Sequence, residues 1–314
     1  MKLADFDPNL VHVDRPQDFD EFWRTTVNEA IAIPLQAQLA PVPMRSTNEV
    51  EVYEIHYNSL DGLEIAGWYC RPRPKYVKPP YPALLCMPGY IAEPELPKSW
   101  AHKGYAALGV APRGKLRSNQ RFNPGYPGLL THNVTNRETY SYRGLYIDAL
   151  RAVDFALSRP EIDSSRIGIR GSSQGGALAI ATAALRPDAI ACGAVSAPFL
   201  AGIMSALDLT HSYPYEELND YLRMYPDSKG AVSSTLSYFD VINFAPLVRS
   251  PLLVGLGLMD DCCPPETGLA LVDALQNCPK IVHTYPRCAH DAGGHWEAAK
   301  VETFLASHLR PLIA

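Results

Sequence analysis

The stretch Gly171-Ser172-Ser173-Gln174-Gly175-Gly176 decides the fold of this chain. A β-rich run at 166–170 precedes it, and small residues with helical character follow it at 177–185. Gly-x-Ser-x-Gly between a strand and a helix is typical of a nucleophile elbow, a turn that exposes a serine hydroxyl at the end of a sheet. Because this turn is strained and crowded, the positions two before and two after the serine exclude a bulky Cβ. The motif therefore predicts Ser173 as a nucleophile, although by itself it fits an ordinary glycine-rich turn equally well.

The composition indicates a globular protein with no strong charge. The chain has 314 residues, of which 47% are hydrophobic, and we expect a single domain over 1–314. Its net charge of −5 is spread along the chain with no Lys/Arg block, which argues against nucleic acid or an anionic membrane as partner. No window approaches 18 consecutive apolar residues, so we expect no membrane span. The opening residues 1–7 lack the apolar run of a signal peptide.

The cysteines indicate reduced thiols. There are seven of them, an odd number, and they are scattered along the chain. That usage favours a cytoplasmic location over a disulfide framework. Cys262 and Cys263 are adjacent, and no second pair stands at zinc-finger spacing. We therefore expect buried thiols there, and no metal.

Apolar periodicity predicts strands that alternate with helices. That alternation indicates an α/β fold with a mostly parallel sheet, right-handed crossovers and helices on both faces. Two of the strands flank a turn at 58–62 and predict a hairpin. Strands are expected at 49–56, 63–72, 83–87, 105–111, 166–170, 190–195, 252–256 and 280–285, and helices at 16–31, 138–158, 177–185 and 296–309.

Two segments interrupt this alternation. Residues 115–136 are rich in Gly, Asn and Pro, and predict a long loop of the kind that is often functional. Between 198 and 246 the strand pattern stops, and Tyr-, Leu- and Asp-rich runs predict a helical insertion between two strands of the sheet.

A serine nucleophile needs a general base and a carboxylate that orients the base. In α/β-hydrolases these follow the serine in the order Asp or Glu, then His. His290 lies on a short loop after the last predicted strand and is our candidate base, with His295 as the alternative. Asp260 and Asp261 both follow the predicted strand 252–256, and of the two Asp260 is our candidate carboxylate. Its neighbour Asp261 is assigned to helix capping or to the pocket.

An oxyanion hole needs two backbone N–H donors. One is expected from Gln174, the residue after the nucleophile, and the other from a loop that follows an early strand. The strand at 83–87 ends in such a loop, and the amide of Tyr90 is our candidate there. Each donor is typically worth ~3 kcal/mol of transition-state stabilisation.

Further segments along nearly the whole chain carry a family resemblance. Together they resemble the acetyl xylan esterase and cephalosporin C deacetylase group, carbohydrate esterase family seven, within the α/β-hydrolase superfamily. The segments are Pro16-Gln17-Asp18-Phe19-Asp20-Glu21-Phe22-Trp23, Tyr126-Pro127-Gly128, Tyr142-Arg143, the run 148–153, the elbow at 171–176, Pro198-Phe199-Leu200, the run 235–240, Gly257-Leu258-Met259-Asp260 and Cys263-Pro264-Pro265.

The resemblance implies an α/β-hydrolase fold with an N-terminal helix and hairpin extension and a helical insertion near 198–246. It implies a cytoplasmic serine esterase that removes acetyl groups from xylo-oligosaccharides and from small esters such as cephalosporin C. The family also implies a hexamer, a dimer of trimers, with the loop at 133–142 at an interface. We expect no metal and no organic cofactor in the reaction.

The resemblance also assigns site residues. It makes Ser173, Asp260 and His290 the catalytic triad, and it gives the oxyanion amides to Tyr90 and Gln174. A small acyl pocket is implied with three lining residues, which are Tyr90, Phe199 and Cys262.

Three stretches depart from the family pattern. Arg113-Gly114-Lys115 replaces Arg-Gly-Gln, Pro88-Gly89-Tyr90 replaces His-Gly-Tyr, and His290-Asp291 replaces His-Glu. None of them removes a triad residue, but each can alter loop packing or pocket polarity. Lys115 brings a charge to the edge of the site if its loop packs as in the family, and is otherwise a solvated lysine.

Other functions on the same fold stay open at this stage. A broad short-chain carboxylesterase or a peptidase would use the same three side chains. A peptidase would also need a site for the amino end of its substrate, and the sequence shows no clear acidic pair for it. A non-catalytic binding module is the third alternative, because a fold does not determine a function.

Overall fold

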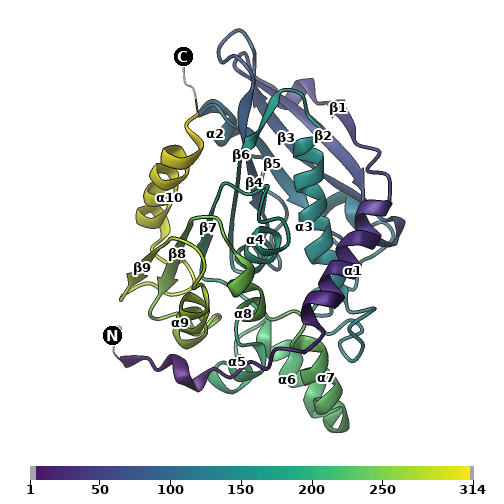
Figure 1. Ribbon diagram of the computed structural model, residues 1–314, viewed down its shortest axis with the longest axis vertical. Helices are drawn as coiled ribbons and strands as arrows, with labels where there is room; N and C mark the ends of the chain where they lie inside the picture. Colours follow the sequence, from purple (N-terminus) through teal and green to yellow (C-terminus); the bar gives the residue numbers. More distant parts are fainter. Residues whose placement is uncertain (1–4, 312–314) are drawn as a thin grey trace.

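The computed structural model describes residues 5–311, and its nine strands join in one sheet (Figure 1). The strand order is β1-β2-β3-β5-β4-β6-β7-β8-β9. The first three pairings, which link β1, β2, β3 and β5, are antiparallel, and every pairing from β5 to β9 is parallel. This confirms the expected mostly parallel sheet of an α/β-hydrolase. The strands are β1 Gln38–Pro41, β2 Val50–Asn58, β3 Glu64–Pro72, β4 Tyr81–Met87, β5 Ala106–Ala111, β6 Ile162–Ser172, β7 Cys192–Ser196, β8 Leu252–Gly257 and β9 Lys280–Tyr285.

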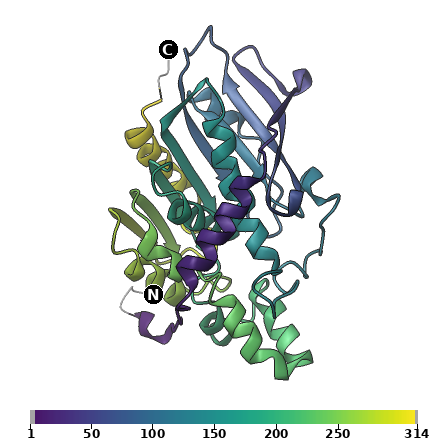
Figure 2. The same ribbon diagram turned by 45° about the vertical axis from the view of Figure 1, so that its right-hand side comes forward.

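Helices cover both faces of the sheet. Side chains alternate along a strand, so Leu85 of β4 packs with the helices of one face while its neighbour Leu84 packs with Phe304 of α10 on the other. Figure 2 shows α1 lying across α3, outside the helices that contact the sheet. The helices of these layers are α1 Phe19–Ala32, α2 Lys98–His102, α3 Ser141–Leu157, α4 Gln174–Leu185, α9 Pro265–Ala274 and α10 Gly294–Leu309.

A helical insertion separates β7 from β8, as the sequence predicts. In Figures 1 and 2 its helices α5, α6 and α7 gather at one end of the molecule, beyond the sheet. The buried Tyr215 ties helix α6 to the segment that follows β7, because its hydroxyl accepts a hydrogen bond from the amide of Leu200 (3.0 Å). Its helices are α5 Ile203–Leu209, α6 Tyr215–Met224, α7 Lys229–Leu236 and α8 Val241–Phe244.

The expected elements differ from the observed ones mainly at their ends. Helix α4 begins at Gln174 rather than at 177, because the elbow turns directly into the helix. The expected hairpin is formed by β2 and β3. The sequence analysis missed β1 and α2. Strand β1 has no buried residue and therefore no apolar pattern to detect.

The start of the chain and the apolar character of the helices bear on the expected absence of a signal peptide and of a membrane span. Residues 1–4 of the opening segment 1–7, used above against a signal peptide, lie outside the described residues. Within residues 5–311, no helix combines the length and the apolar character that a bilayer span requires.

Candidate active site

The elbow serine lies between β6 and α4 in a strained conformation. Ser173 has φ +56° and ψ −124°, a combination that residues with a Cβ rarely adopt. A Cβ on Gly171 would lie 2.3 Å from the carbonyl of Gly175, and one on Gly175 would lie 2.3 Å from the carbonyl oxygen of Met87. Both flanking glycines are therefore sterically required. The serine side chain is held, partly exposed, at the carboxyl end of a strand and the N-terminus of a helix.

A buried carboxylate and an imidazole meet at the same edge of the sheet. The Nδ1–H of His290 donates to Asp260, with distances of 2.9 Å to Oδ2 and 3.1 Å to Oδ1. The Asp260 side chain is only 2% exposed, whereas that of His290 is 35% exposed. Asp260 follows β8 and His290 follows β9, and both strands run parallel to β6 through β7. The carboxyl ends of parallel strands share one edge, where open α/β sheets carry their sites.

The two alternative residues lie elsewhere. Asp261 is exposed and does not cap α9, whose N-cap residue is Pro264 with no side-chain hydrogen bond. The capping role expected for Asp261 is therefore wrong, because the turn after β8 places that residue outside the helix start. His295 is exposed in the first turn of α10, where its ring stacks on Trp296 with centroids 4.2 Å apart.

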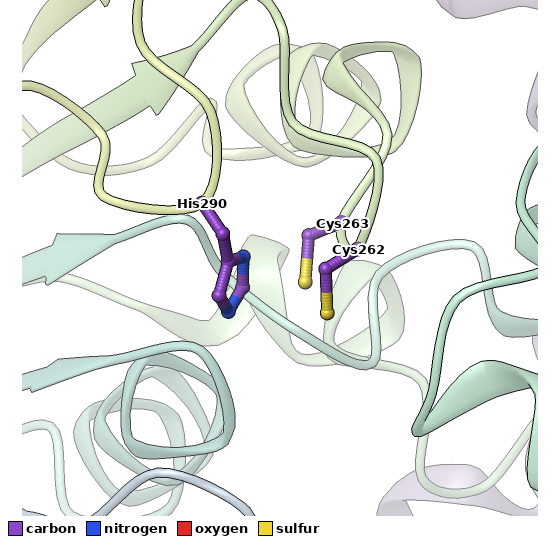
Figure 3. Close-up of side chains that lie close together, drawn as sticks. All are labelled: Cys262, Cys263 and His290. Atoms are coloured by element: carbon purple, nitrogen blue, oxygen red, sulfur yellow. The ribbon is translucent and has the colours of Figure 1, made fainter.

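Two cysteines flank the imidazole (Figure 3). Burial disfavours the charged ring of His290, but its hydrogen bonds to Asp260 and Cys262 raise its pKa to about 10. A hydrogen bond from Cys263 and the neighbouring His290 lower the pKa of Cys262 to about 6, and burial raises the pKa of Cys263 well above its usual value. One proton can lie either on the sulfur of Cys262 or on the ring of His290, which gives a thiol–imidazole form and a thiolate–imidazolium form. Because both forms hold the same number of protons, the two groups titrate as a coupled pair.

Gln174 contributes to the site through its backbone and its side chain. It is the first residue of α4, so its amide N–H has no intrahelical acceptor. Its side chain is fully buried; Oε1 accepts from the hydroxyl of Tyr142 (2.8 Å) and Nε2 donates to the carbonyl of Gly89 (3.4 Å). The helix that begins at the elbow is thereby linked to the loop that follows β4.

Tyr90, on that loop, is anchored by the helical insertion. Its hydroxyl donates to the buried carboxylate of Glu217 and accepts from the amide of Leu130 (3.0 Å). Glu217 also accepts from the amide (3.0 Å) and the hydroxyl (2.9 Å) of Thr131. Burial, followed by the charge of Glu217, raises the pKa of Tyr90, so its hydroxyl stays a donor.

Lys115 supports the loop that carries Tyr90. Its side chain is fully buried, and Nζ donates to the carbonyls of Tyr90 and Ala92, each at 2.8 Å. Because burial disfavours the ammonium, the pKa of Lys115 is lowered to about 8. The alternative of a solvated lysine is therefore wrong. In the sequence, Lys115 stands out only because it replaces the glutamine of the family's Arg-Gly-Gln.

The turn that carries Lys115 rests on a buried ion pair. Both the backbone amide and Nε of Arg113 donate to Oδ2 of Asp148 at 2.8 Å, and Nη2 donates to Oδ1 at 3.0 Å. Asp148 lies on α3 and is fully buried, and Arg113 is 5% exposed. The turn that carries Lys115 is therefore anchored to α3, a helix that packs on the sheet.

The comparisons with known proteins agree with this geometry. A family model described as acetyl xylan esterase (AXE1) matches residues 2–308. The chain belongs to the acetyl xylan esterase family. This confirms the resemblance.

The relatives align with different fractions of this chain and of their own lengths. The acetyl esterase Axe7A of Xylanibacter ruminicola is 30% identical over 276 residues, which are 83% of this chain and 61% of that protein. This chain thus spans less than two thirds of that relative. The solved acetyl xylan esterase of Paenibacillus sp. R4 is 32% identical with a TM-score of 0.88, over 98% of this chain and all of that one. The acetyl xylan esterase 1 of Thermoanaerobacterium sp. JW/SL YS485 is 25% identical, with a TM-score of 0.84 over 97% and 99%. An acylaminoacyl peptidase at 17% identity and a TM-score of 0.64, over 85% of this chain and 43% of that one, shares the fold alone.

In this member of the acetyl xylan esterase family, a cleft of about 680 Å³ opens in front of Ser173 and His290. Tyr90 and Cys262 line it, as expected. Phe199 does not, which corrects the expected pocket. Its side chain is fully buried behind Tyr90, with ring centroids 6.1 Å apart, and it packs more closely on Tyr215 at 4.4 Å.

The cleft also has walls that the sequence analysis did not find. Glu93 and Glu95 line it, but Glu95 is paired with Arg170 (3.0 Å) and Glu93 accepts from the amide of Leu116 (2.7 Å). No sequence spacing brings these segments together, because they meet only when the loops after β4 and β5 pack. The other lining residues that the sequence analysis missed are mostly apolar or aromatic: Ile91, Ala92, Tyr126, Pro127, Tyr213 and Pro214.

Proposed function

We propose that this protein is a serine esterase that removes acetyl groups from acetylated sugars, chiefly xylo-oligosaccharides. The observation that carries the proposal is the hydrogen-bonded pair Asp260–His290 at the same sheet edge as the strained Ser173. In this proposal Ser173 is the nucleophile, His290 the general base and Asp260 the orienting carboxylate. The reaction uses these side chains, two backbone amides and water.

The first half of the reaction acylates the serine. In the thiol–imidazole form of the Cys262–His290 pair, Nε2 of His290 takes the proton of Ser173 as Oγ forms a bond to the acetyl carbonyl carbon. Asp260 fixes the tautomer of His290 and stabilises the imidazolium that forms. The amides of Tyr90 and Gln174 donate to the oxyanion of the tetrahedral intermediate. The imidazolium then gives its proton to the sugar oxygen as the carbon–oxygen bond breaks, and the sugar leaves as an alcohol.

The second half returns the free enzyme. His290 removes a proton from a water molecule, whose oxygen forms a bond to the acetyl carbonyl carbon. The second tetrahedral intermediate uses the same two amides. Its collapse breaks the bond to Ser173, which recovers a proton from His290, and acetate leaves. One water is consumed and one acid is produced for each ester cleaved.

The cleft supports a preference for short acyl groups. The ring of Tyr90 is fixed by Glu217 at its hydroxyl and by Phe199 at its back, so this wall cannot retreat easily. One methylene too many or too few in such a pocket changes binding by ~1–3 kcal/mol. Cephalosporin C is included in the proposal as a small acetyl ester of the same reacting group.

Location and assembly are proposed as well. All seven cysteines lie among the described residues and are unpaired, which supports a reducing cytoplasm. The family resemblance supports a hexamer built from a single-domain chain over residues 1–314. Gel filtration with light scattering tests the assembly, and a monomer would contradict it.

The experiment is hydrolysis of p-nitrophenyl esters of increasing acyl length. We expect a steep preference for acetate and a loss of roughly 10⁴-fold or more in Ser173→Ala. Ser164→Ala is the matched control; this serine is exposed on the same strand β6, does not line the cleft, and should keep activity of the wild-type order. Acetylated xylo-oligosaccharides and cephalosporin C are then assayed by acetate release.

Other outcomes identify the alternatives. Equal rates for short and long acyl chains would make the protein a broad carboxylesterase. Turnover of peptide amides would make it a peptidase, against the observation that Glu93 and Glu95 already have partners. No activity on any ester in either the wild type or Ser173→Ala would leave a binding module.

A further inference from the structure

Cys262, Cys263 and His290 form a compact cluster of metal-ligand types beside the proposed nucleophile. Each offers one ligand atom, and these atoms all lie within 4.8 Å of one another. Figure 3 shows the two cysteine side chains projecting the same way from one turn, with the imidazole ring facing them. Thiolates and imidazoles are the ligands that Zn²⁺ and similar thiophilic cations prefer. The spacing of the two cysteines alone does not indicate a metal, because the third residue comes from the loop after β9.

A single carboxylate preorganises all three residues. Oδ1 of Asp260 accepts the amides of Cys262 (2.9 Å) and Cys263 (2.8 Å), so the chain turns around it. The same carboxylate accepts Nδ1–H of His290 at 2.9 Å, which leaves Nε2 as the ring nitrogen available to an ion. A carboxylate that binds the second nitrogen of a histidine is the usual outer partner of a metal-bound imidazole.

The distances suit a tetrahedral ion after a small movement. With ordinary zinc–sulfur and zinc–nitrogen bonds, ligand atoms lie roughly 3.6–3.8 Å apart. The two sulfurs and a ring nitrogen of His290 now lie within 4.8 Å of one another, so reaching these distances requires shifts of about 1 Å. Cys262 and His290 line the cleft, so an ion can reach the cluster from solvent. Cys263 is buried and within hydrogen-bonding reach of Ser173, so an ion held by its sulfur would lie close to the nucleophile.

We propose that Cys262, Cys263 and His290 bind a thiophilic divalent cation of the Zn²⁺ and Cd²⁺ type, and that the bound ion reversibly inhibits the enzyme. Binding releases two protons to solvent, one from the thiol of Cys263 and one from the Cys262–His290 pair, and forms two metal–sulfur bonds and one metal–nitrogen bond. The lone pair of Nε2 is then no longer available to accept the proton of Ser173. Binding follows from the cluster alone, whereas inhibition rests on the proposed catalytic role of His290.

The test uses the full chain, freed of metal by a chelator and kept reduced by a reductant without thiols. Titration with Cd²⁺ should produce the ultraviolet charge-transfer band of two cadmium–thiolate bonds and saturate at one equivalent. Cys262→Ser should lose the tight phase, with affinity reduced more than about tenfold. Cys278→Ser, which removes a partly exposed thiol that the cleft does not contain, is the matched control and should titrate like the wild type.

Activity gives the second measurement. Zn²⁺ should inhibit p-nitrophenyl acetate hydrolysis in wild type and in Cys278→Ser at the same concentration, and EDTA should restore the rate. In Cys262→Ser, normalised to its own metal-free rate, inhibition should need at least about tenfold more Zn²⁺. Ser173→Ala should still bind Cd²⁺, so a failure of the proposed catalysis leaves the binding result intact. An equal band in wild type and in Cys262→Ser would overturn the site, and so would inhibition by Zn²⁺ without a thiolate band from Cd²⁺.

Discussion

The two sides of the candidate site are built in different ways. On the triad side, Asp260 and His290 follow adjacent parallel strands and bind one another directly, and Asp260 also holds the next turn of its own loop. On the oxyanion side, the loop that carries Tyr90 is held by Lys115, Gln174 and Glu217 from three distant parts of the chain. One side depends on local turns at strand ends, and the other depends on the packing of the whole domain.

This difference predicts which substitutions reduce catalysis and which also reduce stability. A change on the triad side removes a chemical group but leaves the surrounding layers intact. A change on the oxyanion side loosens contacts among the central sheet, the long loop at 115–136 and the helical insertion. We therefore expect the first kind to reduce catalysis with little loss of stability, and the second kind to alter both.

The largest effect should come from Asp260→Asn. The amide keeps an acceptor for the turn that follows, but it no longer favours the tautomer of His290 that accepts the serine proton. We expect kcat for p-nitrophenyl acetate to fall roughly 10⁴-fold, with a melting temperature close to that of the wild type. Asp261→Asn, at the exposed neighbouring carboxylate, is the control and should keep wild-type kcat. A decrease in kcat of less than tenfold in Asp260→Asn would contradict the proposed catalytic role of Asp260.

The second effect is on stability and comes from Arg113→Met. The change leaves the carboxylate of Asp148 buried and without its charged partner. Breaking such a buried pair costs about 3–5 kcal/mol, measured as the free energy of unfolding in urea. Arg24→Met removes an exposed ion pair with Glu21 and should change stability by less than about 1 kcal/mol. Equal losses in the two variants would contradict the anchoring of the Arg113–Lys115 turn by α3.

A double-mutant cycle on Tyr90→Phe and Glu217→Gln measures how strongly the contacts on the oxyanion side depend on one another. Tyr90→Phe removes the donor of the buried hydroxyl–carboxylate contact, and Glu217→Gln replaces its charged acceptor with a neutral amide; each should cost about 1–3 kcal/mol of stability. Because the contact holds the proposed oxyanion loop, we expect kcat to fall about tenfold in each. The double variant should be little worse than either single one, with a coupling energy of about 0.5–3 kcal/mol. Fully additive losses would show that the two side chains act independently.

The smallest effect is a pH dependence that arises from Lys115. Its pKa in the folded protein is about 8, below the ordinary value of 10.5, so between these values the unfolded chain binds more protons than the native one. Stability therefore rises with pH in that window, by at most about 1.4 kcal/mol per pH unit. Urea unfolding at pH 8 and pH 10 should show this rise in wild type relative to Lys115→Gln, which carries the family's residue. The same pH response in both proteins would contradict a buried, titrating Lys115.

The same contrast explains how far the sequence could predict the structure. The elbow, the strands that carry Asp260 and His290, and the helical insertion all have local signatures, because glycine spacing and apolar periodicity act over a few residues. Anchors such as Lys115–Tyr90 and Glu217–Tyr90 join segments 25 and 127 residues apart. No local pattern encodes those contacts. The burial of Phe199 was missed for the same reason, because it depends on Tyr215 of the insertion.

Tyr90 contributes its backbone to the proposed oxyanion hole and its ring to the wall of the cleft, so replacing it changes rate and selectivity together. Phe199 separates the two properties, because it touches the ring from behind and contributes no atom to the cleft. For enzyme engineering, this makes the layer behind the cleft the place to widen acyl preference. Trimming Phe199 gives the ring of Tyr90 room to tilt back while its amide stays in place.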